Sequence, residues 1–566
     1  MSTKSRDSLF YGRFLLFIAG LGGLLYGIDV GIIAAALLYL NKTVNLSLEQ
    51  TSLLVAAVLG GGTVSSLVAG LLADLFGRRK MMIVSGFLFV VSVGLIVVSQ
   101  GFLALFVGRL LQGMSGGVIA VVVPLYLAEC LSANHRGRGT AIFQFMLTFG
   151  IVVAALTGFF YTHQAEAAVA AAAGNPVLIE AAQNHAWRGM FLSVIYPGLI
   201  FFVGSFFLSE TPRWLVRRGR VEAAMTALRR SVSIEEAEIE MREMQALTNE
   251  NKNQALSSSL MQRKYVVPFV LACVILSLNQ ATGINSILGY LVIILKQAGM
   301  TATHATQGDV AVKLLNCVMT IVAIALVDRK GRKFLLNLGT AGIVLSLIAG
   351  GVVFHTFESE RWDVLPRLLS AQVGNSLTFP VNEMSLGRAG VSQSKAGLPM
   401  ALTILYSAGS GDKVVTVLSD APDPMLHIAA SANSNAPLLL KRAQYGPIPT
   451  EGTGWLITAC LGLFIASYAV GPGVVVWLML SELMPTRIRA IGMGIALLLN
   501  QGISTLIAAV FLPVVGNYGY FAIFFFWAGC TILYFLTSAF LVPETKGKSL
   551  EEIEVSFGKR APKTAV

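Results

Sequence analysis

The chain has 566 residues and a formal net charge of +11, yet only 13% of its residues are charged, against roughly 25% in ordinary soluble domains. Hydrophobic residues make up 55%, so the composition excludes a soluble enzyme or a disordered chain and indicates a membrane protein. The five cysteines lie in apolar stretches without a C-x-x-C pair, which argues against a zinc site and a disulfide framework.

Twelve stretches are long and apolar enough to cross a membrane as helices, for which about 20 residues are needed. In chain order they are 14–38, 51–74, 81–100, 103–128, 139–161, 189–208, 267–296, 310–327, 334–354, 455–481, 490–514 and 518–542. The expected fold is therefore an all-α membrane protein with twelve transmembrane helices in two six-helix bundles. A large external insertion separates helices nine and ten.

Lys and Arg gather in the links after the second, fourth, eighth and tenth stretches and are scarce in the links between them. Because positively charged links stay on the cytoplasmic side, we expect a multi-pass protein of the inner or plasma membrane with both termini in the cytoplasm. This topology accounts for the basic excess, so the expected partner is the lipid bilayer and not a nucleic acid.

The segments outside the apolar stretches suggest the domain boundaries. We expect an N-terminal bundle over 1–208, a cytoplasmic helical linker over 209–266, a C-terminal bundle over 267–545 and a cytoplasmic tail over 546–566. The Ala-rich segment 162–187 is expected as an external loop, and 355–454 as a partly ordered external loop with one strand-like run at Lys413 to Leu418. A lid or a docking surface for an external partner is the alternative for 355–454.

The two halves of the chain carry matching charged motifs. They comprise Asp-x-x-Gly-Arg strings at Asp74 and Asp328, acidic residues at Glu129 and Glu482, and Glu-Thr pairs at Glu210 and Glu544. The spacing between corresponding motifs differs by about the length of the insertion. The sequence is therefore a six-plus-six repeat, which is typical of a two-bundle transporter with its substrate site between the halves.

These motifs lie at helix ends on the cytoplasmic side, where acids and arginines of neighbouring helices can form ion-pair latches. We expect such latches to hold the outward-facing state and to part when the inner gate opens. The candidate latch residues are Asp74, Arg78, Arg79, Glu129, Arg136, Glu210, Asp328, Arg332, Glu482, Arg489 and Glu544.

Taken together, the motifs resemble the sugar porter family of the major facilitator superfamily, and bacterial proton–sugar symporters in particular. The strings that carry the resemblance are Gly70 to Arg79, Arg109 with Gly113, Pro124 to Gly137, Glu210 to Leu215, Asn279 to Asn285, Asp328 to Lys333, Gly471 to Arg489 and Pro543 to Gly547. They cover nearly all twelve stretches. The resemblance implies alternating-access transport of a hexose, pentose or polyol.

The resemblance also implies which residues bind the sugar, namely polar residues inside the spans. The matching positions are Gln144, Gln280, Asn285, Asn316, Trp477 and Asn500. Amides offer donors and acceptors to sugar hydroxyls, and an aromatic ring stacks on the apolar face of a sugar. The alternative for the amides is hydrogen bonding between helices.

Asp29 lies inside the first stretch, where an isolated carboxylate is costly and indicates a function. Arg109, at the start of the fourth stretch, is its expected partner. An acid that alternates between an ion pair and a neutral form can link proton uptake to conformation. The resemblance supports this prediction, since proton–sugar symporters have Asp at the matching position. A static structural ion pair is the alternative.

The expected function is import of a monosaccharide with proton symport. The sequence has no G-x-x-x-x-G-K-[ST] loop and no H-E-x-x-H site, so an ATP-driven pump and an enzyme are disfavoured and no cofactor is expected. The open alternatives are an uncoupled facilitative sugar or polyol carrier, a transporter-like sugar sensor, and a non-sugar substrate.

Overall fold

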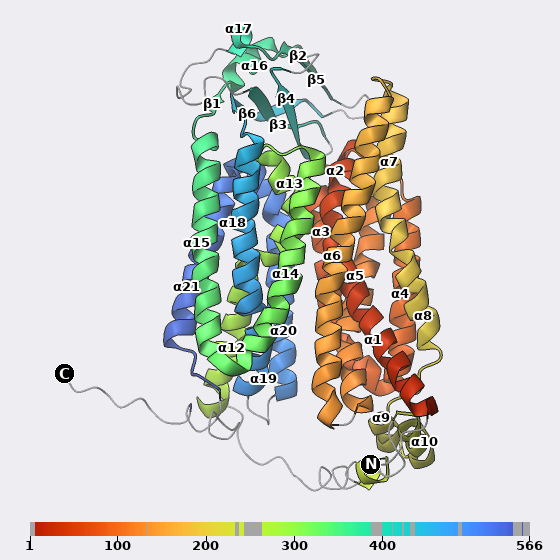
Figure 1. Cartoon of the computed structure of the whole chain (residues 1–566). Coiled ribbons are helices and arrows are strands. Elements are labelled where there is room, and N and C mark those ends of the chain that lie inside the picture. The colour runs from red at the N-terminus through yellow and green to blue at the C-terminus, as the bar shows by residue number, and fades with distance from the viewer. Residues whose placement is uncertain are drawn as a thin grey trace, which may run out of the picture.

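In the computed structural model, two helical bundles stand side by side and a small β-rich domain covers one end of them (Figure 1). The structure describes residues 6–131, 133–231, 237–242, 263–386, 399–409, 411–420, 424–430, 436–484, 489–546 and 557. We call the end of the bundles near Phe76 and Arg332 the terminal face, because α1 begins there and α21 ends there. We call the opposite end, beneath the β-rich domain, the domain face.

The N-terminal half contains the first six membrane-spanning elements. Its helices are α1 (Arg6–Gly31), α2 (Ile33–Thr43), α3 (Leu48–Phe76), α4 (Arg78–Val98), α5 (Phe102–Cys130), α6 (Ala133–Ala171), α7 (Pro176–Ser193) and α8 (Ile195–Ser205). Close helix contacts hold this half together. A Cβ atom at Gly27 would lie 1.9 Å from the carbonyl oxygen of Leu147, so only glycine lets α1 approach α6 this closely.

The C-terminal half repeats this arrangement. Its helices are α12 (Arg263–Ala281), α13 (Ile284–Gln297), α14 (Ala302–Lys330), α15 (Arg332–Glu358), α18 (Glu451–Val470), α19 (Pro472–Leu483), α20 (Arg489–Tyr518) and α21 (Tyr520–Phe540). Two short helices, α9 (Pro212–Arg217) and α10 (Val221–Ser231), follow the N-terminal half in the chain and lie beneath it on the terminal face. Twelve apolar helices within the described residues are long enough to cross a membrane, which confirms the predicted number.

Four of the spans are interrupted. The first breaks between α1 and α2, the sixth between α7 and α8, the seventh at Gly283 and the tenth at Gly471. Gly283 has a φ of +84°, and a Cβ atom there would collide with the ring of Trp527 at 2.4 Å, so the break requires glycine. Where a span is interrupted, backbone N–H and C=O groups lose their partners within the helix. They are tolerated at membrane depth only where the bundle interior supplies other partners.

Two expectations for the connecting segments are wrong. The segment 162–187 is helical, because α6 continues to Ala171 and α7 begins at Pro176. Alanine has the highest helix propensity, so this segment extends the spans instead of forming a loop. The described residues between Glu358 and Glu451 form a folded domain with its own sheets and apolar core, which differs from the expected loop.

The inserted domain contains two antiparallel sheets. Its elements are β1 (Trp362–Asp363), α16 (Leu365–Ala371), β2 (Ser376–Pro380), α17 (Glu383–Leu386), β3 (Met400–Ser407), β4 (Asp412–Leu418), β5 (Met425–Ala429) and β6 (Leu439–Pro447). One sheet has the order β1-β6-β3-β4 and the other pairs β2 with β5. Buried Leu377, Leu402 and Tyr445 belong to its own apolar core. The predicted strand at Lys413 to Leu418 is confirmed as part of β4.

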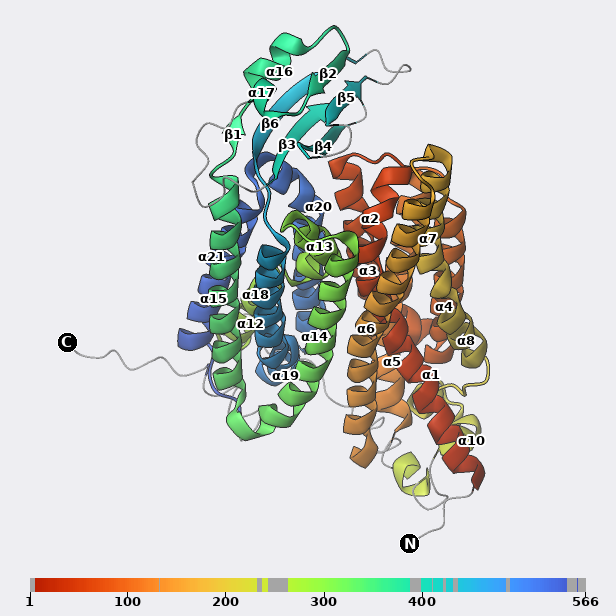
Figure 2. The ribbon, with the colours of Figure 1, turned by 45° about the horizontal axis from the view of Figure 1, so that its top comes forward.

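The domain contacts both halves at the domain face (Figure 2). On the C-terminal side, Arg442 donates to the Gly516 carbonyl oxygen at 3.0 Å. On the N-terminal side, Lys413 donates to Asn45 at 2.9 Å, and the Asp412 backbone N–H donates to Glu49 at 3.3 Å. A cavity of about 230 Å³ lies between the domain and the two halves.

The halves meet near the domain face and stand apart toward the terminal face (Figure 1). On the closed side, Leu512 N donates to Ser52 Oγ at 3.3 Å, and the Thr63 and Thr505 hydroxyls are 3.5 Å apart. Further toward the terminal face, α3 exposes Leu67 and Leu71. The described contacts therefore correspond to a state that is closed at the domain face.

Candidate functional site

A cluster of polar side chains lies around the break between α12 and α13. Gln280 donates from Nε2 to Asn500 Oδ1 at 3.2 Å, and Asn285 donates from Nδ2 to Gln280 Oε1 at 3.0 Å. Asn285 Nδ2 also lies 2.7 Å from the Ser504 hydroxyl, while Asn500 donates to the Leu276 carbonyl oxygen at 2.9 Å. We call Gln280, Asn285, Asn500 and Ser504 the amide cluster.

The break at Gly283 produces this geometry. It turns the chain between Gln280 and Asn285, so that two residues of one span reach two residues of α20 that lie one turn apart, Asn500 and Ser504. Gln280 and Asn500 are buried, whereas Asn285 is partly exposed. The amide cluster therefore offers both donors and acceptors, and Asn285 is a member with part of its surface accessible.

The other three residues that the sequence suggested for sugar binding lie outside this cluster. Gln144 on α6 is half-buried, Asn316 on α14 is buried, and Trp477 on α19 is 41% exposed. Among the described residues, no side-chain hydrogen bond or ring contact joins these three to the amide cluster. Thr148 and Cys317, which are 3.7 Å apart, bring α6 and α14 together close to Gln144 and Asn316.

Asp29 and Arg109 are both buried inside the N-terminal half. Arg109 donates to Gln112 at 2.7 Å and lies over the ring of Phe191. The two charges influence each other through space, but the expected direct ion pair is not formed in this state. Within the described part of the chain, neither carboxylate oxygen of Asp29 makes a well-formed hydrogen bond, although the Gln112 side chain lies beside the carboxylate.

Tyr26 links the surroundings of Asp29 to the other half. A Cβ atom at Gly116 would touch both the Tyr26 ring and the Asp29 carboxylate. Tyr26 also interacts with Gln501, which neighbours Asn500. Tyr26 and Ser504 were not among the residues predicted from the sequence, although each is a polar residue one helical turn from Asp29 or Asn500.

At the terminal face, one arrangement of charges occurs in both halves. In the N-terminal half, Arg78 donates to Glu129 at 2.9 Å, and Thr211 donates to the other Glu129 oxygen at 2.5 Å. Glu210 accepts the backbone N–H groups of Arg78 and Arg79. Asp74 contacts Arg78 at 2.7 Å, with its own side chain 55% exposed.

The C-terminal half repeats these contacts. Arg332 donates to Glu482 at 3.2 Å, and Thr545 donates to Glu482 at 2.5 Å. Glu544 accepts the backbone N–H groups of Arg332 and Lys333 at 3.1 Å each. The repeated motifs therefore occupy equivalent three-dimensional positions.

Both sets of contacts lie within a half and not between the halves. They are formed although the halves stand apart at the terminal face, so the expectation that they part when this face opens is not met in this state. Arg217, which the sequence analysis missed, contacts Glu129 at 3.2 Å. The side chains of Arg136, Asp328 and Arg489 lie outside the described part of the structure.

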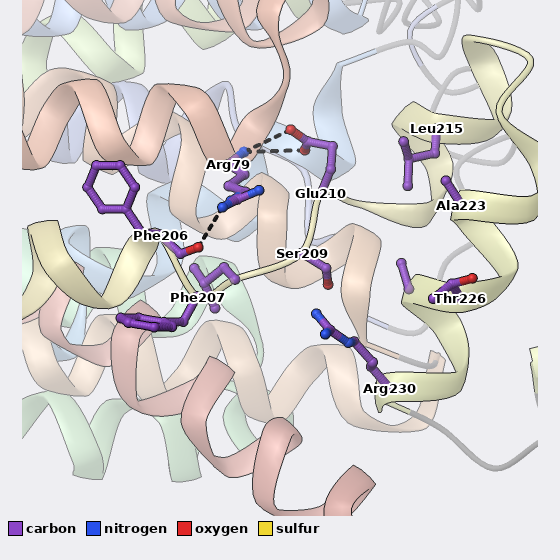
Figure 3. Close-up of a pocket in the computed structure, with 11 residues that line it drawn as sticks. Arg79, Phe206, Phe207, Ser209, Glu210, Leu215, Ala223, Thr226 and Arg230 are labelled. Atoms are coloured by element: carbon purple, nitrogen blue, oxygen red, sulfur yellow. Dashed lines mark hydrogen bonds between the residues drawn. The ribbon is translucent and has the colours of Figure 1, made fainter.

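Arg79 has a different role from Arg78. Its guanidinium donates to the Phe206 carbonyl oxygen, while Glu210 binds only its backbone (Figure 3). These residues line a cavity of about 650 Å³ that Thr226 and Arg230 of α10 border on another side. Burial raises the pKa of Glu210 above its ordinary value although three backbone N–H groups oppose this shift. Burial also tends to raise the pKa of Glu544. The backbone N–H groups that donate to its carboxylate outweigh this effect, so the pKa of Glu544 is lowered below its ordinary value.

A family model described as "Sugar (and other) transporter" matches residues 15–369 and 429–557. The chain belongs to this family of sugar porters. The unmatched stretch lies inside the inserted domain. A member of this family is a transporter and not an enzyme.

Curated relatives of this sugar porter match over nearly their full length. The glucose transporter GlcP of Staphylococcus epidermidis is 28% identical and covers 97% of this chain and 98% of its own. The proton myo-inositol cotransporter hmit-1.1 of Caenorhabditis elegans is 29% identical, with 96% and 90% covered. The probable metabolite transport protein CsbC of Bacillus subtilis is 27% identical, with 97% and 95% covered.

Solved structures share the same fold. The inward-open xylose transporter XylE from E. coli superposes with a TM-score of 0.67 at 21% identity and covers 96% of this chain and 98% of its own. A D-xylose–proton symporter structure gives a TM-score of 0.63 at 20% identity, with 95% and 100% covered. These likenesses establish the major facilitator fold.

Proposed function

We propose that this sugar porter imports a hexose or pentose by alternating access, coupled to proton symport through Asp29 and Arg109. The observation that carries the proposal is the amide cluster, in which groups from separate spans converge at a helix break. Amide side chains inside a span are costly unless they have hydrogen-bond partners. Here their partners are one another and Ser504, and the hydroxyl groups of a bound sugar can replace these partners. Gln144, Asn316 and Trp477 complete the proposed substrate site.

Proton coupling is supported by the surroundings of Asp29. A buried carboxylate without a donor is least costly as the neutral acid, so the state closed at the domain face favours a protonated Asp29. Arg109, held by Gln112, is the group that stabilises the carboxylate once the proton has left. Relatives named as a proton myo-inositol cotransporter and a D-xylose–proton symporter support the same assignment.

The terminal face is the cytoplasmic face in this proposal, because the links with most Lys and Arg lie there. Both termini are then cytoplasmic, and the inserted domain is external on an inner or plasma membrane, where an external partner can reach it. The repeated charge contacts brace the cytoplasmic helix ends within each half.

Uptake into proteoliposomes tests this proposal. We expect labelled xylose, glucose or myo-inositol to accumulate under an inward proton gradient and to equilibrate when a protonophore collapses the gradient. Accumulation that persists with the protonophore contradicts proton coupling. A panel in which no sugar or polyol exchanges contradicts the substrate class.

An uncoupled sugar or polyol carrier is the second candidate. Relatives named as a facilitated glucose transporter of Xenopus laevis and a probable inositol transporter of Arabidopsis thaliana favour it. The same experiment separates the two candidates, because an uncoupled carrier equilibrates its substrate with or without a proton gradient.

A further inference from the structure

Asp309 and Lys313 form an ion pair inside the membrane-spanning helix α14. They lie one helical turn apart, with Lys313 Nζ 2.8 Å from Asp309 Oδ2, and their side chains are 1% and 0% exposed. Charged residues buried in a span are rare and indicate a function. Neither the amide cluster nor the Asp29–Arg109 region includes this pair.

Lys313 also bonds to the other half of the molecule. Its Nζ donates to the carbonyl oxygen of Gly31 at 3.1 Å. Gly31 is the last residue of α1, where a helix presents carbonyl groups and the negative end of its dipole. Lys313 therefore joins α14 to the break in the first span, two residues after Asp29.

The pair does not behave as a self-sufficient structural ion pair. Asp309 Oδ1 has no hydrogen-bond partner within the described residues. A buried ion pair offsets the loss of hydration only when its remaining polar atoms are also satisfied. Lys313 satisfies one carboxylate oxygen, and its remaining described bond crosses to Gly31.

We propose that Lys313 is a positioning residue that closes the domain face. Asp309 holds the ammonium group against the end of α1, and the bond to Gly31 exists only while the two halves are together at this face. Opening the face must break this bond, because its partners lie on different halves. This proposal assumes one part of the proposed function, namely alternating access. It requires neither proton coupling nor a particular sugar.

Two double variants test the proposal. Asp309→Lys with Lys313→Asp keeps an ion pair at the same spacing but places a carboxylate against the Gly31 carbonyl. Asp309→Asn with Lys313→Met removes both charges, so no unpaired charge remains buried. Lys546→Met is the matched control, since it removes a lysine that donates to a backbone carbonyl oxygen, that of Arg329, within one half.

The measurement is the distance between spin labels in a background without native cysteines and without sugar. Labels at Val177 and Thr301 report the domain face, and labels at Phe76 and Phe334 report the terminal face; all four positions are exposed. We expect both double variants to lower the ratio of closed to open domain face by about tenfold or more, as loss of a hydrogen bond to a charged group predicts. Lys546→Met leaves the ratio unchanged.

An unchanged ratio in the Asp309→Asn, Lys313→Met variant overturns the proposal, whether or not the exchanged pair folds. The readout uses no sugar and no proton gradient. A failure of the proposed symport therefore leaves this result interpretable, and a failure here leaves the symport proposal standing.

Discussion

Gln280 and Asn500 are joined by a hydrogen bond of 3.2 Å, although they lie on α12 and α20 and are separated by 220 positions in the chain. The bond forms because the break at Gly283 directs Gln280 and Asn285 to the same part of α20. Asn500 itself is held by the Leu276 carbonyl oxygen. This relationship defines the proposed sugar site more narrowly than any single motif.

Replacing Gln280 with alanine should weaken sugar binding about tenfold or more. The substitution removes the group that connects Asn285 to Asn500, and one hydrogen bond in a buried site is worth about 1 kcal/mol or more. Counterflow of labelled sugar at increasing concentrations measures this loss. Gln164→Ala, an exposed position on α6, is the control, and equal behaviour of the two variants would refute the assignment.

Asp29→Asn should abolish accumulation of sugar while sparing exchange. Asparagine resembles the neutral acid in shape but cannot release a proton, so sugar reaches equal concentrations on both sides. Uptake driven by a proton gradient and counterflow without one measure the two activities in the same vesicles. Accumulation retained by Asp29→Asn would contradict its role in coupling.

Glu210 and Glu544 should affect stability with opposite dependence on pH. The raised pKa of Glu210 means that its charged form destabilises the fold above that pKa, and this penalty disappears as the pH falls through it. The lowered pKa of Glu544 means that its charge stabilises the fold above the ordinary glutamate value of about 4.3, and this contribution is lost as the pH falls through the lowered value.

Thermal unfolding of Glu210→Gln and Glu544→Gln in detergent between pH 4 and 7 tests this pair. At pH 7 we expect Glu544→Gln to lower the Tm by about 1–2 °C and Glu210→Gln to leave it unchanged or raise it, since solvent screens both groups. The Glu210→Gln difference should shrink as the pH falls toward the ordinary glutamate value, whereas the Glu544→Gln difference should persist until the pH falls below about 4.3. If Glu210→Gln and Glu544→Gln lowered the Tm equally at pH 7, the two charges would not have opposite effects on stability, and the prediction would be wrong.

Cross-linking the inserted domain to the N-terminal half should stop transport. Cysteines at Asn45 and Lys413, joined by a short bis-maleimide, would hold the domain face closed, because these residues lie in contact in this state. Cysteines at Thr403 and Thr416, whose hydroxyls are 3.3 Å apart within one sheet, are the control and should leave transport intact. Undiminished uptake by the first cross-linked protein would rule out movement of the domain as a lid.

Several features could be predicted from the sequence because they depend on order along the chain. Apolar length fixes the twelve spans, and the repeated motifs fix the correspondence of Arg78 with Arg332 and of Glu129 with Glu482. Asp29, Gln280 and Asn500 could also be predicted as functional residues, because they are polar or charged residues inside apolar stretches. The helical segment 162–187 was missed, since hydropathy reports membrane spans but not the helix propensity of alanine beyond them.

Tertiary structure alone decided which of these residues meet. A hydrogen bond depends on distance and direction in space, and the sequence does not specify how two helices far apart in the chain are placed. Arg217 beside Glu129 and Lys313 against the Gly31 carbonyl follow from such placement. The separation of Asp29 from a direct ion pair with Arg109 belongs to the same class, because it depends on the conformational state of the two halves.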